Sequence, residues 1–273
     1  TGFYFMKHDN SYMAISANPV GLKGKGNHKH NDIFSFHLAV DGENYIVDPG
    51  TCVYTSDVED RNNFRSTSYH NTVMIDGEEI NSFNGMSLFQ MKEEAMPVVN
   101  TWISNQEFDF FEGVHFGYTK LPDPLLHRRR ILFLKETVAW VVQDLVGPDV
   151  SSKSNHKRTD TIHDVKILFH FVPMEFDLDF QNNMLIDSHY LKRFNNLLPL
   201  TSHSNNDFLT LKASKGLFLQ LIGSSHMLSG EIIEGWISPS YGIKYKAPVF
   251  VLKGNFSGSL SSTYLIAPGP ETL

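Results

Sequence analysis

The chain has 273 residues, of which 41% are hydrophobic and 19% are charged, and it contains 21 Phe, 10 Tyr and 3 Trp. This apolar content is enough for a large core, which excludes a disordered or fibrous chain. Lys and Arg number 23 against 30 Asp and Glu, a formal charge of −7. Such an acidic balance argues against a nucleic-acid partner, because no basic excess exists to neutralise phosphates.

Features of cellular location are few. No apolar stretch approaches the roughly 18 residues that a membrane-spanning helix needs. The chain begins Thr1-Gly2, without an initiator methionine or a signal segment, which suggests a processed protein or a piece of a longer one. A single cysteine, Cys52, cannot form an internal disulfide and leaves the redox compartment open.

Apolar and polar residues alternate with a period of two along much of the chain, which predicts β-strands. The first clear strand covers Ile33–Val40, and Asp41-Gly42 then predicts a tight hairpin turn into Tyr45–Val47. Sustained helical periodicity is absent, so the fold class is expected to be all-β, a large antiparallel sandwich with under about a tenth of its residues in helices. Further strands are predicted at Asn71–Asp76, Leu125–Leu134, Val138–Val142, Val165–Val172, Phe208–Ala213, Leu217–Ile222, Glu231–Ile237, Pro248–Leu252 and Ser259–Ile266.

Residues 147–164 contain almost no apolar side chains and are expected to form a polar surface insertion. No repeat of fixed period occurs elsewhere. We therefore expect residues 1–273 to form a single β-sandwich domain that carries this insertion.

The segment 21–32 concentrates unusual residues. Three glycines within six residues let a ligand approach the main chain, but the Lys-Ser/Thr ending of a phosphate-binding loop is missing. His28 and His30 are two residues apart, a moderate signal for a metal site. A cupin-type site would also need a carboxylate three or four residues later, where the chain has Ile33 and Phe34, so the cupin interpretation weakens.

Three motifs together resemble one known family. Residues 24–32 read Gly-x-Gly-x-His-x-His-x-Asp, residues 47–51 read Val-Asp-Pro-Gly-Thr, and residues 61–73 read Arg-x-x-Phe-Arg-Ser-Thr-x-x-His-Asn-Thr-Val. This combination resembles the heparinase II/III family of polysaccharide lyases. Fainter similarity continues through residues 112–118 and 235–242, so the resemblance spans nearly the whole chain.

The resemblance implies a large antiparallel β-sandwich of the galactose-mutarotase type, preceded by an N-terminal α/α toroid that is absent from this chain. Substrate would lie in the cleft between the two domains. Because the toroid of the family supplies a catalytic Tyr and an Asn, this chain would hold only part of the active site. The family also implies an anionic polysaccharide as substrate and a periplasmic or secreted location.

Site residues follow from the same resemblance. His28 matches the catalytic histidine of the sandwich, whereas His30, Asp48 and His70 match the zinc ligands, and these ligand types are ordinary for zinc. Spacing argues against this triad. If the hairpin turn has two residues, Asp48 falls opposite Ser35 and roughly 17 Å from His30 along an extended strand.

The implied reaction is β-elimination at a uronic acid, in which the carboxylate is neutralised, the C5 proton is removed and the departing O4 is protonated. His28 would act as the acid–base partner or neutralise the carboxylate, since an imidazole titrates near working pH. Tyr54 would line the cleft or share in proton transfer. Arg61 and Arg65 would clamp a carboxylate or sulfate, although an intramolecular role for them is equally expected.

Two alternatives remain open at this point. One is a non-catalytic carbohydrate-binding or scaffold sandwich; the other is a sugar mutarotase or isomerase, which would need no metal. Histidines within apolar strands are expected to be structural: His37, His115, His127 and His170.

Overall fold

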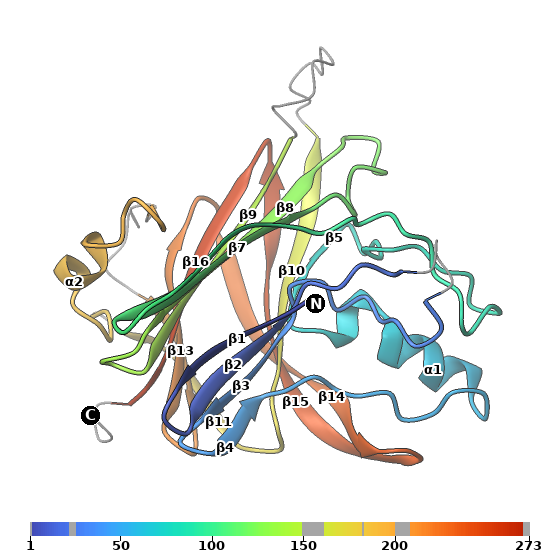
Figure 1. Ribbon diagram of the computed structural model, residues 1–273, viewed down its shortest axis with the longest axis horizontal. Helices are drawn as coiled ribbons and strands as arrows, with labels where there is room; N and C mark the ends of the chain where they lie inside the picture. Colours follow the sequence, from blue (N-terminus) through green and yellow to red (C-terminus); the bar gives the residue numbers. More distant parts are fainter. Residues whose placement is uncertain (1, 22–25, 149–160, 182, 200–207, 270–273) are drawn as a thin grey trace.

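The structure is a computed structural model that describes all residues except 1, 22–25, 149–160, 182, 200–207 and 270–273. Its described residues form one eight-stranded and two four-stranded sheets, and all strand pairs are antiparallel (Figure 1). Strands make up 51% of the described residues and helices 7%. The predicted all-β sandwich is therefore confirmed.

The eight-stranded sheet has the order β11-β12-β13-β16-β9-β8-β7-β6. Neighbouring strands β7, β8 and β9 pair along nearly their whole length, and they form its most continuous part. Its strands are β6 (Val98–Ser104), β7 (Phe108–His115), β8 (Leu126–Leu134), β9 (Ala139–Gly147), β11 (Phe176–Gln181), β12 (Phe208–Ala213), β13 (Leu217–Ser224) and β16 (Leu260–Pro268).

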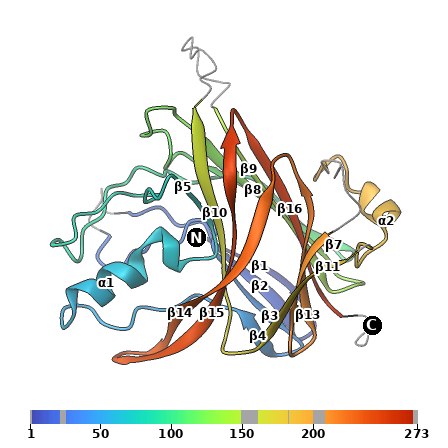
Figure 2. The ribbon, with the colours of Figure 1, turned by 180° about the vertical axis from the view of Figure 1, so that it is seen from behind.

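The two smaller sheets have the orders β1-β2-β3-β4 and β14-β15-β10-β5. Helix α1 lies on the side to which the β14–β15 hairpin projects, as opposite views show (Figures 1 and 2). The elements are β1 (Phe3–His8), β2 (Ser11–Ser16), β3 (Phe36–Val40), β4 (Glu43–Ile46), β5 (Val73–Ile75), β10 (Ile162–His170), β14 (Leu228–Ser240), β15 (Ile243–Ser257), the helices α1 (Val58–Arg65) and α2 (Ser188–Lys192), and the 3-10 turn η2 (Thr67–Tyr69).

One hydrophobic core joins the three sheets. It includes Phe36 of the first sheet, Phe169 of the second, and Phe111, Trp140 and Tyr264 of the third. Each large apolar side chain buried in this way contributes about 1.5–3 kcal/mol to the free energy of folding. The core holds the three sheets together and includes Phe36 and Ile46, next to the segments that carry the candidate site residues before β3 and after β4.

The Asp41-Gly42 hairpin is confirmed. Val40 pairs with Glu43 as the two-residue turn predicts. Asp41 (φ +51°) and Gly42 (φ +84°) both lie in the left-handed region, which a type I′ turn requires. This hairpin alone does not bring His30 close to Asp48. The position of His30 therefore depends on the path of the chain before β3.

The predicted strand start at Ile33 was wrong, because β3 begins only at Phe36. Phe34 has φ +59°, and the Ser35 amide donates to the Asp32 carbonyl 3.0 Å away, so the chain turns there. Phe34 is nevertheless fully buried. The alternating pattern predicts this burial but not the turn. This turn changes the direction of the chain just before β3.

Helix α1 was not predicted, although its buried positions are spaced with a helical period. Its buried side chains are Arg61, Phe64 and Arg65, so two of the three inward positions are charged and do not count in a hydrophobic pattern. The carboxylate of Asp57 caps the helix by accepting from the Asp60 amide at 2.9 Å. The strands β1, β2, β6, β7 and β11 were also missed.

The predicted polar insertion, residues 147–164, overlaps the last residue of β9 and the first three residues of β10, and residues 149–160 lie outside the described part of the chain. No helix in the described ranges is both long enough and apolar enough to span a membrane.

Candidate functional site

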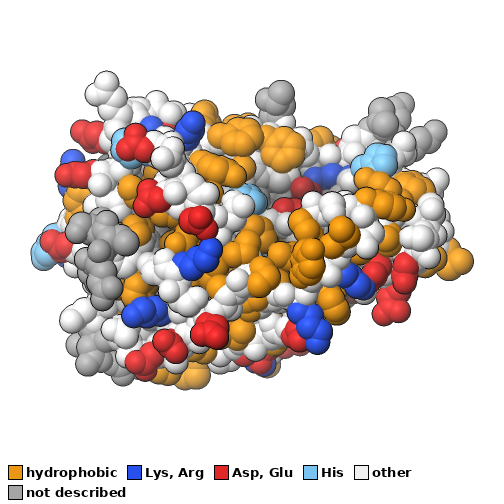
Figure 3. All heavy atoms as spheres, turned by 90° about the horizontal axis from the view of Figure 1, so that it is seen from below, with side chains coloured by type: hydrophobic (Ala, Val, Ile, Leu, Met, Phe, Trp, Pro, Cys, Tyr) orange, Lys and Arg blue, Asp and Glu red, His pale blue; other side chains and the backbone are white. Residues whose placement is uncertain are grey.

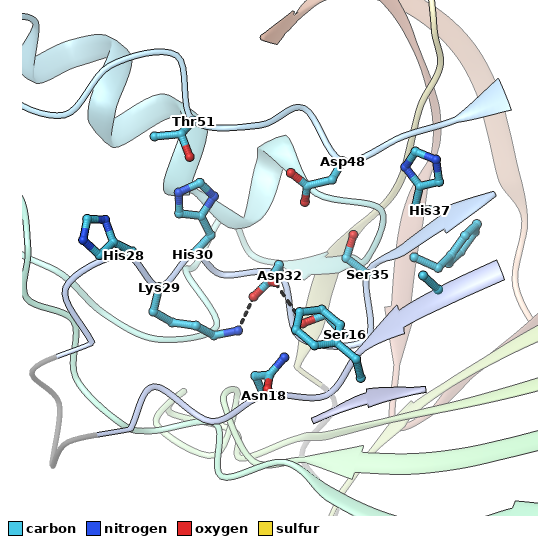
Figure 4. Close-up of a pocket in the computed structure, with 13 residues that line it drawn as sticks. Ser16, Asn18, His28, Lys29, His30, Asp32, Ser35, His37, Asp48 and Thr51 are labelled. Atoms are coloured by element: carbon cyan, nitrogen blue, oxygen red, sulfur yellow. Dashed lines mark hydrogen bonds and ion pairs between the residues drawn. The ribbon is translucent and has the colours of Figure 1, made fainter. Parts of the chain in front are cut away.

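A pocket of about 430 Å³ opens beside β2 and β3 and is lined in part by His28, His30 and Asp32 of the segment that precedes β3. His28 and His30 lie on one side of it, with Asp48 across from them (Figure 4). These three residues were predicted to belong to the site from the sequence motifs. Because the chain turns at Phe34, His30 and Asp48 are not held roughly 17 Å apart, as they would be along one extended strand.

His30, Asp48 and His70 come together although they lie far apart in the sequence. His70 Nδ1 is 3.1 Å from Asp48 Oδ2, and the His30 and His70 rings have centroids 5.3 Å apart. His70 is fully buried, whereas the Asp48 side chain is 46% exposed. The arrangement gives one buried and one half-buried imidazole with a carboxylate open to the pocket.

Burial alone would lower the pKa of His70, but the charge of Asp48 and its hydrogen bond outweigh burial and raise the pKa. Burial would raise the pKa of Asp48, and the same pairing instead holds it well below its usual range. For His30, burial and the nearby His70 and Arg61 lower the pKa to about 3. His30 is therefore neutral at pH 7 and offers a nitrogen lone pair.

The residues were tested for their fit to zinc. His70 Nε2 is buried and has no hydrogen-bond partner, while Nδ1 faces a carboxylate, as in many metal-bound histidines. This donor set fits zinc in its chemistry. Among the described residues, however, no three His, Cys, Asp or Glu side chains are arranged as a metal site, and His30 Nε2 instead lies 2.9 Å from Arg61 Nη1. The zinc ligands stay a prediction.

His28 and Tyr54 contact each other at the edge of the pocket. Their ring centroids are 5.0 Å apart in an edge-to-face arrangement. His28 is exposed and Tyr54 is half-buried, so both can reach a ligand. The structure thus brings the two predicted catalytic residues side by side.

Arg61 and Arg65 are both buried in α1 and donate to the protein itself. Arg61 donates to the carbonyls of Leu88 and Asn27 as well as contacting His30. Arg65 donates to Asn62 Oδ1 and to the carbonyls of Asn84, Ser87, Leu88 and Gln90. A buried guanidinium needs such partners for its donors, and this arrangement favours the intramolecular role over a clamp on substrate.

Lys29 and Asp32 are pocket residues to which the sequence assigned no role beyond local charge. They form an ion pair, and Ser16 Oγ donates to Asp32 Oδ2 at 2.9 Å. Burial would raise the pKa of Asp32, but the ammonium group of Lys29 outweighs it and keeps the pKa below its usual value. The pair fixes the loop between His28 and Phe34.

Asn71 was also missed, although it stands in the His-Asn-Thr-Val motif next to His70. Its Nδ2 donates to the carbonyls of Phe36 (2.8 Å) and Val47 (2.9 Å), and its Oδ1 accepts from the His170 amide at 2.6 Å. One side chain thus joins β3, the residue before Asp48 and the end of β10. The sequence signal for this role was an asparagine placed between apolar strand residues, because a buried amide needs backbone partners.

A second buried polar group lies behind the site. Arg129 makes two hydrogen bonds to Asp144 and donates to the carbonyls of Phe34 (2.7 Å) and Asn71 (2.6 Å). His127 Nε2 also lies 2.7 Å from Asp144. This group supports both loops that carry the site, and its histidine is structural, as expected.

Comparison with known proteins shows the family to which the chain belongs. The family model described as "Heparinase II/III-like, C-terminal" matches residues 1–261. A search of curated proteins finds no match.

Among solved structures, the heparan sulfate lyase HepC from Pedobacter heparinus is similar, with a TM-score of 0.69 and 19% identity over 98% of this chain and 35% of that one. A heparinase III, the BT4657 gene product, has a TM-score of 0.67 and 19% identity, again over 98% of this chain and 35% of that one. This chain therefore spans about a third of the length of these proteins. With a family match over residues 1–261, the chain belongs to the heparinase II/III-like, C-terminal family.

Proposed function

We propose that this chain is the β-sandwich portion of a polysaccharide lyase that cleaves a uronic-acid-containing polysaccharide by β-elimination. The observation that carries the proposal is the position of His28, which is exposed at the edge of the pocket and contacts Tyr54. Family membership supports it, and so do the names of the two similar structures, which are a heparan sulfate lyase and a heparinase III.

The reaction needs a group that neutralises the uronate carboxylate and groups that move a proton from C5 to the departing O4. His28 supplies an imidazole for proton transfer or for pairing with the carboxylate. Tyr54, whose ring contacts that of His28, would line the cleft or share the proton transfer. Buried Asn71 and Arg129 hold the loops in place and do not contact substrate.

The proposal includes zinc held by His30, Asp48 and His70. The free Nε2 of buried His70 and the neutral ring of His30 support it. When bound, zinc would supply a fixed positive charge and would stabilise the folded loops. Without it, the buried Nε2 of His70 costs free energy because no donor or acceptor satisfies it.

The remaining parts of the proposal rest on the family. An N-terminal toroid domain would complete the cleft in the full-length protein, in keeping with the third of HepC that this chain covers. The protein would act in the periplasm or after secretion on a glycosaminoglycan or another uronate polymer.

The test is formation of unsaturated uronates, followed by ultraviolet absorbance, with full-length protein and a panel of uronate polymers. His28→Ala should lower the rate by a factor on the order of 10² to 10⁴ while the protein stays folded. His8→Ala, which changes an exposed histidine of β1, is the matched control and should keep full activity. Binding of polymer without any product would instead support a non-catalytic carbohydrate-binding sandwich, and full activity of His28→Ala would remove His28 from the mechanism.

A further inference from the structure

The β14–β15 hairpin brings residues from the far end of the chain to the candidate site. Its strands pair down to Ser240 and Ile243, and Tyr241-Gly242 connects them. Gly242 has φ +74°, which suits a tight turn at this position. In both ribbon views the hairpin projects on the side of α1 (Figures 1 and 2).

Backbone hydrogen bonds fix this hairpin tip to the segment that follows Asp48. The Ser238 amide donates to the Pro49 carbonyl at 2.7 Å, and the Gly242 amide donates to the Cys52 carbonyl at 2.8 Å. Gly50 allows this approach, since a Cβ there would lie 2.3 Å from the Ser238 carbonyl oxygen. The tip is therefore positioned before any ligand arrives.

Two aromatic residues of the hairpin have different surroundings. Trp236 packs against the small core of Cys52, Val53 and Phe64, so it attaches the hairpin to the site loops. Tyr241 is 62% exposed and lies beyond that core. A ring that solvent still contacts on most of its surface contributes little to folding, but a ligand that covers it gains the burial of a large apolar area.

The Tyr241 ring continues a row of rings that starts at His28. Its centroid is 5.8 Å from that of Tyr54, with the planes 30° apart, and Tyr54 in turn contacts His28. Arg61 lies 5.4 Å from the Tyr54 ring centroid and fixes that ring from within the protein. Tyr241 thus lies one ring further from the pocket than Tyr54.

We propose that Tyr241, together with Tyr54, forms an aromatic shelf that stacks one sugar ring of an anionic polysaccharide next to the ring held at His28. A pyranose has a face of C–H groups that suits an aromatic ring, while its hydroxyl and carboxylate groups point outward to other partners. The shelf rests on the proposed function, and it sets the register of the polysaccharide over His28.

Other exposed apolar side chains of the hairpin do not share this position. Viewed from below, hydrophobic side chains are exposed over much of this face of the molecule (Figure 3). Tyr245 is 53% exposed and pairs with Ile237, so it points to the face of the hairpin opposite Trp236. Tyr245 is therefore a matched control, equal in type and similar in exposure.

The experiment measures binding of size-defined heparan sulfate octasaccharides and alginate hexasaccharides by calorimetry, in a His28→Ala background that should slow cleavage. We expect Tyr241→Ala to raise Kd about tenfold for an oligosaccharide that binds, because one aromatic contact is lost. Tyr241→Phe should stay within about twofold of the parent, since the ring is kept. Tyr245→Ala should bind as the parent does.

Equal binding by Tyr241→Ala and its parent would overturn the shelf alone, as would an equal loss in Tyr245→Ala. Unchanged binding with a lowered unfolding temperature in Tyr241→Ala would show that the ring contacts protein, which also overturns the shelf. If the parent binds neither oligosaccharide and full-length protein cleaves no uronate polymer, the proposed function and the shelf fail together.

Discussion

Two histidine–aspartate pairs are linked through Arg129, which bonds to Asp144 and to the carbonyl of Asn71 next to His70. They differ in how many of their polar atoms have hydrogen-bond partners. His70 and Asp48 are on loops, 3.1 Å apart, and Asp48 faces the pocket. His127 and Asp144 are on the adjacent strands β8 and β9, 2.7 Å apart, and both are fully buried. The residue types are the same, so the difference comes from their surroundings.

In the strand pair the remaining polar atoms have partners. His127 Nδ1 lies 2.9 Å from His115 Nε2, and Asp144 also accepts from Arg129 and from the Tyr264 hydroxyl at 2.6 Å. In the loop pair the Nε2 of His70 has no partner. A satisfied pair holds strands together, whereas an unsatisfied buried nitrogen beside a pocket is a candidate ligand for a metal.

The largest effect is expected in the satisfied pair. Asp144→Ala would leave Arg129 buried without its carboxylate, which should lower the free energy of unfolding by about 3–5 kcal/mol. Urea denaturation measures it, and Glu43→Ala, which breaks an exposed pair with Lys215, should cause no measurable change. A loss in Asp144→Ala as small as in the control would mean that the buried network does not stabilise the fold.

Substitutions at the loop pair should change the zinc content of the protein. Purified without chelator, the protein should hold about one equivalent of zinc by elemental analysis, and His70→Ala and His30→Ala should each lose it. Both variants should also unfold at a lower temperature. His28→Ala should keep the metal, since His28 has no place in the ligand set. Zinc that survives in His70→Ala would show the triad to be wrong.

Asn71 lies between the loop pair and the Arg129–Asp144 network. A substitution of the same shape should separate its hydrogen bonds from its packing. Asn71→Asp would turn two donors into acceptors that face the carbonyls of Phe36 and Val47, at a cost of about 1–3 kcal/mol. Asn10→Asp, in an exposed turn, is the control for the added charge. Chemical denaturation at pH 7 compares them. Equal stability of the two variants would show that Asn71 does not hold the loops.

The smallest effect concerns a third cluster, in which His163 lies between Asp76 (2.7 Å) and Asp123 (3.2 Å). Burial would lower the pKa of His163, but the hydrogen bonds and charges of the two carboxylates outweigh it and raise the pKa. A raised pKa in the folded state means that the stabilisation is complete below the unfolded value, near 6.5, and is lost as pH rises through the folded value.

His163→Gln should therefore flatten the fall in unfolding temperature from slightly acidic to slightly basic pH. The effect is modest because both carboxylates are partly exposed and screened. His226→Gln, a histidine on the neighbouring loop, should leave the slope as it is. An unchanged slope in His163→Gln would assign the pH dependence to other groups.

The sequence by itself determined much of the sheet structure and most of the candidate site. A period of two sets which side chains face the core, and Asp41-Gly42 specifies its own turn, so most strands and this hairpin could be predicted locally. The motifs, through their resemblance to the heparinase II/III family, predicted His28 and Tyr54 for proton transfer and His30, Asp48 and His70 for zinc, and these residue types suit those roles.

Only the tertiary structure decided which of these residues meet. The left-handed Phe34 breaks the predicted strand and carries His30 back toward His70, a change of direction that alternation cannot show because Phe34 is buried in either case. Burial of Arg61 and Arg65 depends on a helix whose inward positions are charged, which hides its period. Tyr241 reaches Tyr54 through strand pairing across almost two hundred residues, and such long-range contacts depend on how the sheets pack rather than on local sequence.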